Sequence, residues 1–565
     1  MTGLKEKLDR VLNDRNALRR SARYTFQHFD RNGDGELCLL ELRRCIDSLV
    51  RNMELPPVDD ETVYKLMQRY DIDENGARLS QAEFAMLYES ILSNVRAKYY
   101  QDRKLCLDRQ QMVSHKQLKR DEQFWSFFSK VRRLGSGSFG EVFLVKDNTS
   151  QLERVCKVID KKTSSCPLLQ IYAEVEIMKR VDHPSVIKIF EVFEDSQYMY
   201  IIMETCLGGE LLAYILDGEK KGKRFSEAQV AKIMKQVLEA VAYCHSQNII
   251  HKDLKPENIM LHTPDNFDTV KVIDFGVAET FASGKYIFPA GTALYMAPEV
   301  FNRRCGLKAD VWSSGVILYV LLTGMLPFFG SSTEELSKKI QKYEPNYAVD
   351  CRVVSRQGRD LLRRMLSKSV HDRPSAKECL EHDWFRQVKC ETAVLDCDLD
   401  SNLQKYMRGN ELKGLVYNVM SHEMNVTGPE IRKLSKLFRS MDTNKDGVLS
   451  RDEVASCLSR AGWSSRDIDR LVNAIDTSGE GAIGYTELVA ACMDWSESYL
   501  NLVWGTFQKL DSNGDGVISA EDFRTLLTGK NGGAISERDI RRMLKEVDPT
   551  NTGVTWDNFK KWILC

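Results

Sequence analysis

A short acidic pattern recurs near both ends of the 565-residue chain and not in its middle, and it constrains the fold more than any other feature. The pattern starts with aspartate, places oxygen-bearing side chains at alternate positions and has glycine at its sixth position. The starts are Asp30, Asp71, Asp442, Asp476, Asp511 and Asp548. The last four lie 34, 35 and 37 residues apart, which leaves room for a helix, a loop and a second helix in each repeat. We therefore expect paired helical repeats at both ends and a different domain between them.

The recurring pattern has the chemistry of the calcium loop of an EF-hand. Calcium takes six to eight oxygen ligands, and such a loop supplies them from positions 1, 3 and 5, the carbonyl of position 7 and a carboxylate at position 12. Two loops meet the pattern in full, with Asp30, Asn32, Asp34, Glu36 and Glu41, and with Asp442, Asn444, Asp446, Val448 and Glu453. A third has a weaker hydroxyl ligand and comprises Asp476, Ser478, Glu480, Ala482 and Glu487. A fourth ends in the shorter aspartate, a feature that favours magnesium over calcium, and comprises Asp511, Asn513, Asp515, Val517 and Asp522.

The other two loops depart from the pattern. In the loop that starts at Asp71, Ala82 occupies position 12. In the loop that starts at Asp548, Thr550 replaces an acidic ligand and Asn558 stands where glutamate belongs. We expect both to be structural partners of a competent neighbour. A single match could be an ordinary acidic turn, but four good loops at paired spacing favour calcium binding.

Composition narrows the classes of partner and compartment. Lys plus Arg number 80 and Asp plus Glu number 81, so the net charge of −1 favours neither nucleic acid nor an anionic membrane as the main partner. The 15 cysteines form no C-x-x-C pair and no secretory signal precedes them, which predicts reduced thiols and a cytoplasmic location. The longest apolar stretch is interrupted by Thr323 and Pro327, so no membrane span is expected. We expect neither a myristoyl nor a prenyl anchor, and palmitoylation stays an open alternative. We also expect the protein to be a monomer.

The middle of the chain alternates strand-like and helical patterns and carries a series of motifs. Gly135, Gly137 and Gly140 in LGSGSFGEV lie between strand-like runs, where backbone amides can approach nucleotide phosphates. Farther on, the chain reads RVCKVI, AEVEIMK, IIHKDLKPENIM, DFG and APE, in that order. Any one of these residues could be an ordinary loop carboxylate or surface lysine. Their order and spacing from Phe124 to Phe385 resemble the eukaryotic protein kinases.

The resemblance implies an ATP-dependent active site. Asp253 would accept the proton of the substrate hydroxyl, assisted by Lys255, whose position favours serine and threonine substrates. Lys157 would hold the phosphates and pair with Glu174. Magnesium would be held by Asn258 and Asp274. The residues expected to contact ATP are Leu134, Gly135, Ser136, Gly137, Ser138, Phe139, Gly140, Val142, Val155, Lys157, Met203, Glu204, Cys206 and Met260. Because the lysine and both aspartates are retained, we expect an active enzyme.

Three residues depart from the common kinase pattern. Lys252 replaces the arginine that reads a phosphate on the activation segment, and lysine lacks its bidentate geometry. Activity independent of that phosphate is therefore expected. Val155 replaces the usual alanine above adenine, and Met203 stands at the gatekeeper position.

Two carboxylates indicate the class of substrate. Glu210 and Glu257 occupy positions that meet a substrate arginine in calmodulin-kinase-like relatives, and paired carboxylates favour a guanidinium group. The alternatives are a solvated surface pair or, for Glu210, a contact with ribose. We expect basic protein substrates.

Together, a kinase, an amphipathic junction and four C-terminal loops resemble the calcium-dependent protein kinases of plants and apicomplexan parasites. The expected fold is α+β, a bilobal kinase with all-α EF-hand domains at both ends. The expected divisions are an N-terminal EF-hand pair (1–92), a helical linker (93–123), the kinase (124–386), the junction (387–424) and a calmodulin-like domain (425–565). The resemblance does not explain the N-terminal hands.

The resemblance further implies a calcium switch. Apolar residues of the junction would enter grooves that calcium opens in the hands, namely Leu412, Leu415, Val416, Val419 and Met420. At rest, Lys405, Arg408 and Lys413 would lie near Glu210 and mimic a substrate. Two alternatives are a kinase fold that serves as a calcium-gated scaffold and a kinase that recruits separate calmodulin. A junction that is only a spacer is a third.

Overall fold

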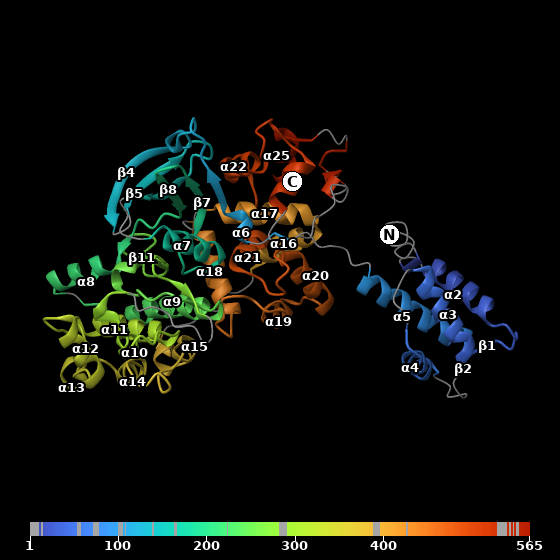
Figure 1. The fold of residues 1–565 in the computed structure, drawn as a ribbon, viewed down its shortest axis with the longest axis horizontal. Coiled ribbons are helices and arrows are strands. Elements are labelled where there is room, and N and C mark those ends of the chain that lie inside the picture. The colour runs from blue at the N-terminus through green and yellow to red at the C-terminus, as the bar shows by residue number, and fades with distance from the viewer. Residues whose placement is uncertain are drawn as a thin grey trace. The chain divides into compact units, whose positions relative to one another are not determined.

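The computed structural model describes residues 11–12, 15–53, 58–71, 78–99, 106–107, 109–137, 140–162, 167–222, 224–281, 291–387, 396–424, 428–527, 540–541, 544–545, 547–549 and 553–564. The chain divides into two compact units, Met1–Lys104 and Leu105–Cys565. Figure 1 shows the helices and strands of each.

The first unit is a pair of helix–loop–helix hands joined by a small sheet. Its elements are α2 (Arg15–Phe29), β1 (Glu36–Cys38), α3 (Leu39–Asn52), α4 (Asp60–Tyr70), β2 (Arg78–Ser80) and α5 (Gln81–Tyr99). β1 and β2 pair antiparallel, with Leu37 opposite Leu79, and both leucines are fully buried. Phe26 and Phe84 pack in the same core, so the strands and helices of the two hands close around one cluster.

The second unit begins with a six-stranded sheet in the order β3-β7-β8-β6-β5-β4. The strands are β3 (Ser114–Gln117), β4 (Phe128–Gly137), β5 (Gly140–Asp147), β6 (Glu153–Asp160), β7 (Ile189–Glu194) and β8 (Tyr198–Met203). Helix α7 (Leu168–Arg180) buries Ile171, Val175 and Met178 in the core that also contains Ile189 and Ile201 of the sheet. This lobe is the expected β-rich half of the central domain.

Strand β3 corrects one prediction. The sequence predicts a helical linker over residues 93–123, but within it Ser114–Gln117 is a strand that runs parallel to β7. Among the described residues ahead of it, the linker is helical at the end of α5, up to Tyr99, and in the short helix α6 (Arg109–Met112), and Leu107 and Met112 are buried. Pairing with the sheet edge outweighs the local preference, because strand formation depends on the neighbouring strand more than on the residues themselves.

The second lobe is largely helical. Its helices are α8 (Leu211–Lys220), α9 (Glu227–Ser246), α10 (Pro298–Phe301), α11 (Lys308–Thr323), α12 (Thr333–Lys342), α13 (Tyr347–Asp350), α14 (Arg356–Met365) and α15 (Ala376–Leu380). Short strands at its upper edge are β9 (Gly209–Glu210), β10 (Ile249–Ile250), β11 (Ile259–Leu261), β12 (Val270–Val272) and β13 (Glu279–Thr280). α11 is buried from Ala309 to Thr323, which explains its apolar sequence. Among the described residues, no helix has the length and apolar character needed to span a membrane.

The C-terminal part is a helical domain that packs beside the kinase lobes within the same unit (Figure 1). Its helices are α16 (Cys397–Arg408), α17 (Glu411–Glu423), α18 (Pro429–Met441), α19 (Arg451–Leu458), α20 (Ser465–Ile475), α21 (Tyr485–Cys492), α22 (Leu500–Leu510), α23 (Ala520–Leu527) and α25 (Trp556–Leu564). Leu449 and Ile483 bridge the first two loops, and β14 (Val517–Ile518) pairs with β15 (Val554–Thr555) between the last two. The four repeats therefore form two pairs.

The junction consists of two helices rather than one. α16 ends at Arg408, with Gly409 as its C-cap, and Asn410 caps α17 by accepting a hydrogen bond from the backbone N–H of Lys413. The apolar residues expected to enter a groove, Leu412, Leu415, Val416, Val419 and Met420, are all buried in the core of the C-terminal domain. The junction is thus an integral part of that domain in this structure.

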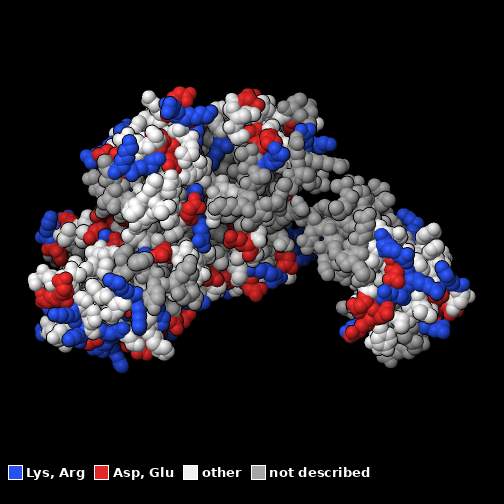
Figure 2. Space-filling model, in the orientation of Figure 1, with Lys and Arg blue, Asp and Glu red and all other residues white. Residues whose placement is uncertain are grey.

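Charges of both signs are mixed over the surface. Figure 2 shows basic and acidic side chains interspersed on the kinase lobes, without a large region of one sign among the described residues of the displayed face. This agrees with the near-zero net charge.

Candidate functional site

The glycine-rich turn lies between β4 and β5, where Gly137 pairs with Gly140. Gly140 has φ of +150°, and a Cβ atom there would lie 1.9 Å from the carbonyl oxygen of Val158. Only glycine fits this approach to β6. Ser138 and Phe139, both expected to contact ATP, lie outside the described residues.

The lysine expected to bind the ATP phosphates is held in a formed ion pair. Lys157 on β6 lies 2.8 Å from Glu174 on α7 and 3.9 Å from Asp274. Glu174 is buried, and the lysine side chain is 14% exposed. α7 is therefore placed so that lysine, glutamate and the DFG aspartate converge, which is the arrangement that phosphoryl transfer requires.

The catalytic loop gathers its polar groups around Asp253. Lys255 Nζ donates to Asp253 Oδ2 at 2.7 Å, and Asn258 Nδ2 donates to the carbonyl of Asp253 at 2.8 Å. The backbone N–H and the hydroxyl of Thr292 both donate to Asp253 Oδ1. Burial alone would raise the pKa of Asp253, but the hydrogen bonds from Lys255 and Thr292 outweigh it and hold the pKa below its usual value. The carboxylate is thereby kept ionised and oriented.

A buried carboxylate fixes the backbone of this loop. Asp310 on α11 accepts hydrogen bonds from the backbone N–H groups of His251 and Lys252, each at 2.9 Å. Lys252 has φ of +69°, and its side chain is 6% exposed and lies 2.9 Å from Glu279 on β13. The lysine that replaces the common arginine therefore already has an acidic partner within the chain.

The residues of the expected adenine pocket come from strands of both lobes. Val155 and Met203 are paired residues on β6 and β8, and Met260 lies on β11. The side chain of Glu204 points away from this pocket, because it forms an ion pair with Lys271 at 2.8 Å and accepts the backbone N–H of Lys188. Adenine could then form hydrogen bonds with the backbone of Glu204 but not with its side chain. The thiol of Cys206 is buried, and burial raises its pKa, so it is chemically inert.

Glu210 and Glu257 lie on neighbouring segments. Glu210 is exposed and precedes α8, and β9 contacts the turn Pro256–Asn258 that contains Glu257. Among the described residues, Glu257 Oε2 is shielded from solvent and has no hydrogen-bond partner. An acceptor of this kind suits a guanidinium donor.

The calcium loops have the required turns and oxygen donors. Gly35, Gly447, Gly481 and Gly516 at position 6 all have φ between +79° and +84°. Asp442 Oδ1 is buried without a hydrogen-bond partner in the described part of the chain. Burial raises the pKa of Asp442 to about 6 and that of Glu487 to about 7. A cation would relieve the cost of burying these carboxylates, so the donor set fits calcium.

The carboxylates at position 12 bond to their own loops. Glu453 accepts the backbone N–H groups of Asn444 and Ser450, and Glu487 accepts those of Ser478 and Gly484. Within the described residues, no three His, Cys, Asp or Glu side chains converge tightly on one point. Parts of the loops that start at Asp71 and Asp548 lie outside the described residues.

The comparison with known proteins agrees with both the kinase site and the calcium loops. A protein kinase domain matches residues 128–385, and an EF-hand domain pair matches residues 19–89, 431–493 and 505–564. Calcium-dependent protein kinase 5 of Plasmodium falciparum is 34% identical over 80% of this chain and 81% of its own length. The chain belongs to the calcium-dependent protein kinase family. Calcium-dependent protein kinase 6 of Plasmodium berghei is 37% identical over 98% of this chain, which spans only 37% of that relative.

Family membership accounts for the cofactors, whereas two residues near the sites were not predicted from the sequence. As a kinase with EF-hands, the protein uses magnesium with ATP and binds calcium. Thr292 was missed in the sequence, although the GTALYMAPE motif carries a signal for it. Arg78 was also missed, and no local pattern predicts that its Nη1 lies 3.1 Å from Asp34 Oδ2 and 3.4 Å from Glu36 Oε2 in the first calcium loop.

Proposed function

We propose that this protein is a calcium-activated serine/threonine kinase that phosphorylates proteins with basic residues near the target hydroxyl. The observation that carries the proposal is the 2.8 Å contact between Lys157 and Glu174 in a chain whose calcium-loop domain packs against the same lobe. Protein kinases switch by making or breaking this pair. A movement of the calcium-loop domain on calcium binding would therefore act on the lobe that carries Lys157 and Glu174.

In the proposed reaction, Asp253 accepts the proton of the substrate serine or threonine as the hydroxyl oxygen bonds to the γ-phosphorus of ATP. The bond from that phosphorus to the β,γ-bridging oxygen breaks, and ADP leaves. Lys255, which already contacts both Asp253 and Thr292, stabilises the charge that develops between hydroxyl and phosphate. Lys157 orients the phosphates. Asn258 and Asp274 would hold magnesium, which neutralises negative charge on the phosphates.

The proposed preference for basic substrates rests on Glu210 and Glu257. The unpartnered Oε2 atom of Glu257 and the exposed carboxylate of Glu210 offer two acceptors on adjacent segments. A substrate arginine three residues before the phosphorylated residue would satisfy them with charge-assisted hydrogen bonds. Peptide-array profiling of the full chain tests this preference, and profiles without arginine enrichment would contradict it.

The proposed switch passes through the junction. Here Lys405 lies 3.9 Å from Asp494, and the ammonium group of Lys413 lies over the ring of Tyr417. Both contacts belong to the C-terminal domain, so the substrate-like placement of these lysines near Glu210 belongs to a second, resting conformation. Calcium would shift the population between the two because it binds one arrangement of the hands more tightly.

Independence from activation-segment phosphorylation is part of the proposal. The ion pair between Lys252 and Glu279 gives the loop lysine an internal partner where other kinases use a phosphate. We further propose a cytoplasmic monomer, in keeping with reduced cysteines outside disulfide bonds in the described part of the chain.

A phosphorylation assay of the full chain, with and without free calcium, tests the function. We expect calcium to stimulate phosphate transfer to a basic peptide, and Asp253→Asn to abolish it. Calcium-independent activity would contradict the proposed switch. Turnover retained by Asp253→Asn would contradict the catalytic assignment, and activation only after calmodulin is added would favour the alternative that recruits an external sensor.

A further inference from the structure

The segment before the kinase domain contacts both the kinase and the C-terminal calcium domain. Leu107 donates its backbone N–H to the carbonyl of Thr477 at 2.9 Å, and its side chain is buried in the core of the C-terminal domain. Lys509 on α22 donates to the carbonyl of Met112 at 2.9 Å. A few residues later, β3 pairs with β7 of the kinase sheet. Thus a single short segment is bonded to two domains.

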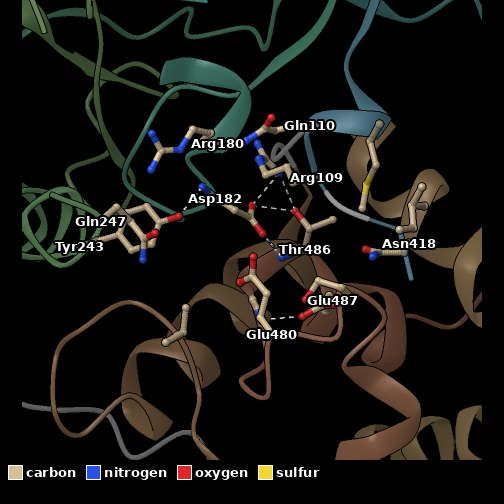
Figure 3. A pocket seen from close by; sticks show the side chains of 15 residues that line it. Arg109, Gln110, Arg180, Asp182, Tyr243, Gln247, Asn418, Glu480, Thr486 and Glu487 are labelled. Atoms are coloured by element: carbon tan, nitrogen blue, oxygen red, sulfur yellow. Dashed lines mark hydrogen bonds and ion pairs between the residues drawn. The ribbon is translucent and has the colours of Figure 1, made fainter. Parts of the chain in front are cut away.

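At the centre of this segment, Arg109 forms a three-part polar contact (Figure 3). Arg109 Nη1 donates to Asp182 Oδ1 at 2.9 Å and to Thr486 Oγ1 at 3.2 Å. Thr486 donates its backbone N–H to Asp182 Oδ2 at 2.8 Å and its hydroxyl to Asp182 Oδ1 at 2.7 Å. The side chains of Arg109 and Asp182 are 11% and 13% exposed, so solvent screens their attraction only weakly.

The three residues come from three functionally different places. Thr486 immediately precedes Glu487, the position-12 ligand of the second C-terminal calcium loop, and lies in the first turn of α21. Asp182 follows α7, the helix that carries Glu174, by two residues. Arg109 lies in the segment before the kinase domain. The contact therefore connects the end of a calcium loop to the helix that completes the catalytic ion pair.

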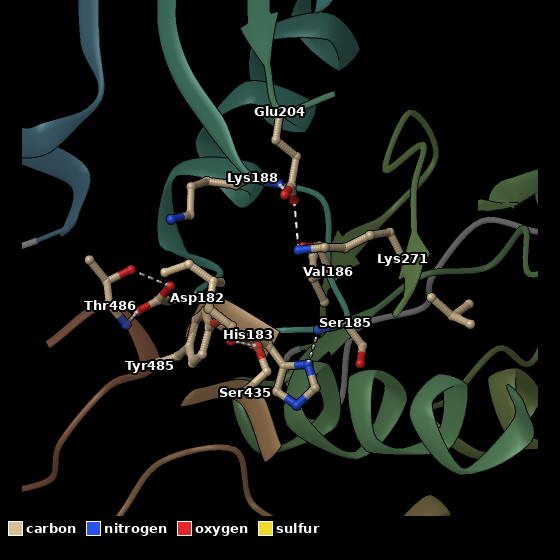
Figure 4. A network of polar contacts seen from close by, with 12 residues as sticks. Asp182, His183, Ser185, Val186, Lys188, Glu204, Lys271, Ser435, Tyr485 and Thr486 are labelled. Atoms are coloured by element: carbon tan, nitrogen blue, oxygen red, sulfur yellow. Dashed lines mark hydrogen bonds and ion pairs between the residues drawn. The ribbon is translucent and has the colours of Figure 1, made fainter. Parts of the chain in front are cut away.

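The same stretch of kinase backbone continues to the hinge (Figure 4). Asp182 donates its backbone N–H to the hydroxyl of Tyr243, and the Tyr243 ring packs so closely on Gly447 of the first C-terminal loop that a Cβ there would lie 2.4 Å away. Lys188 donates to the carbonyls of Ser421 and His422 at the end of α17, each at 3.4 Å, and its backbone N–H bonds Glu204. Through these contacts, a movement of the calcium domain would also displace the loop between α7 and the hinge.

We propose that Arg109 is a positioning residue that fastens the second C-terminal EF-hand to α7, so that the segment before the kinase domain is a working part of the calcium switch. The inference rests on the proposed calcium activation. Arg109 supplies the positive charge that lets a carboxylate of the kinase and the end of a calcium loop share one buried site. Without that charge, the Asp182 carboxylate keeps the neutral donors from Thr486 and the longer-range attraction of Lys188.

The size of the effect follows from linkage. Charge-assisted hydrogen bonds of this kind bias a two-state equilibrium by roughly ten- to a hundredfold. If the contact exists only in the calcium-favoured arrangement, its loss destabilises that arrangement. A higher calcium concentration, acting at each competent site, is then needed to restore the same active population. Spread over three C-terminal loops, this amounts to about a two- to fivefold increase in the calcium concentration for half-maximal activity.

Arg109→Gln in the full chain tests the proposal, with Arg180→Gln as the matched control. Arg180 lines the same cavity but is exposed, and no dashed contact joins it to the labelled residues of Figure 3. We expect Arg109→Gln to raise the half-maximal calcium concentration about two- to fivefold, with kcat at saturating calcium and the KM for peptide close to wild type. Arg109→Lys should recover part of the shift, because it keeps the charge but not the geometry.

Several outcomes would overturn the proposal. One is an unchanged calcium response in Arg109→Gln, and another is an equal shift in Arg180→Gln. A third is a loss of kcat at saturating calcium without a calcium shift, which would indicate a purely structural role. If Arg109→Gln does not fold, Thr486→Val removes only the hydroxyl and should shift the response in the same direction by a smaller factor. A wild-type chain that ignores calcium would instead refute the proposed function itself.

Discussion

Lys157 and Asp274 contact the phosphates and the metal in the proposed mechanism rather than the hydrophobic core. We expect Lys157→Met and Asp274→Asn each to lower phosphate transfer at least about a hundredfold, because both remove charge from the site of the transferred group. Circular dichroism and calcium titration of the full chain should remain as in the wild type. Wild-type turnover in either variant would show that the catalytic residues are assigned wrongly.

Arg78 places a positive charge against two expected ligands of the first calcium loop. A cation that enters the loop must compete with this guanidinium group. We expect Arg78→Gln to tighten calcium binding at the Asp30 loop by about two- to fivefold, since the pair is half exposed and partly screened by water. Titration calorimetry of the full chain measures the change.

Lys65→Gln is a matched control for that prediction. It removes the same charge from the same unit, at an exposed position whose partner is Glu61 rather than a loop ligand. Equal binding changes in the two variants would mean that the overall charge of the unit, and not the contact between Arg78 and Asp34, sets the affinity.

At the scale of elements, the junction helix α17 is the clearest case of structure set by packing. Leu412 is fully buried among the helices of the C-terminal domain. We expect Leu412→Ala to lower the free energy of unfolding of that domain by about 2–5 kcal/mol, because it leaves a cavity. Chemical denaturation followed by tryptophan fluorescence measures this change. Ser401→Ala on the exposed side of α16 should stay within about 0.5 kcal/mol of wild type, and equal effects of both would contradict the packing argument.

At the scale of the whole molecule, the proposed switch requires calcium to shift the balance between two arrangements of the kinase and its hands. Moving from about 1% to 99% active needs roughly a 10⁴-fold preference, or about tenfold at each of four competent sites. Only three C-terminal loops have a full or nearly full set of ligands, counting the aspartate-terminated one. Each must then contribute about twentyfold, or the Asp30 loop must help, or the switch is incomplete.

Removing the position-12 carboxylates tests this balance. We expect Glu453→Gln combined with Glu487→Gln to abolish most of the calcium stimulation of the full chain, because two of the sites lose their bidentate ligand. Activity against a basic peptide, measured over a range of free calcium, gives the result. Asp60→Asn, an exposed carboxylate at the start of α4, is the control for lost charge. An unaltered response in the double variant would reject the C-terminal loops as the sensor.

The chemistry proposed for this protein could be predicted along the chain, because it depends on short spacings. Asp253, Lys255 and Asn258 lie within six residues, and each calcium loop is a local turn around one glycine, so both motifs can be read along the chain. Tertiary structure decided what depends on distant partners. Thr292 reaches Asp253 across the activation segment, Ser114–Gln117 becomes a strand only beside β7, and Arg109 meets Asp182 and Thr486 from far along the chain. Such contacts leave no local period or spacing, because each residue is placed by the packing of a different element.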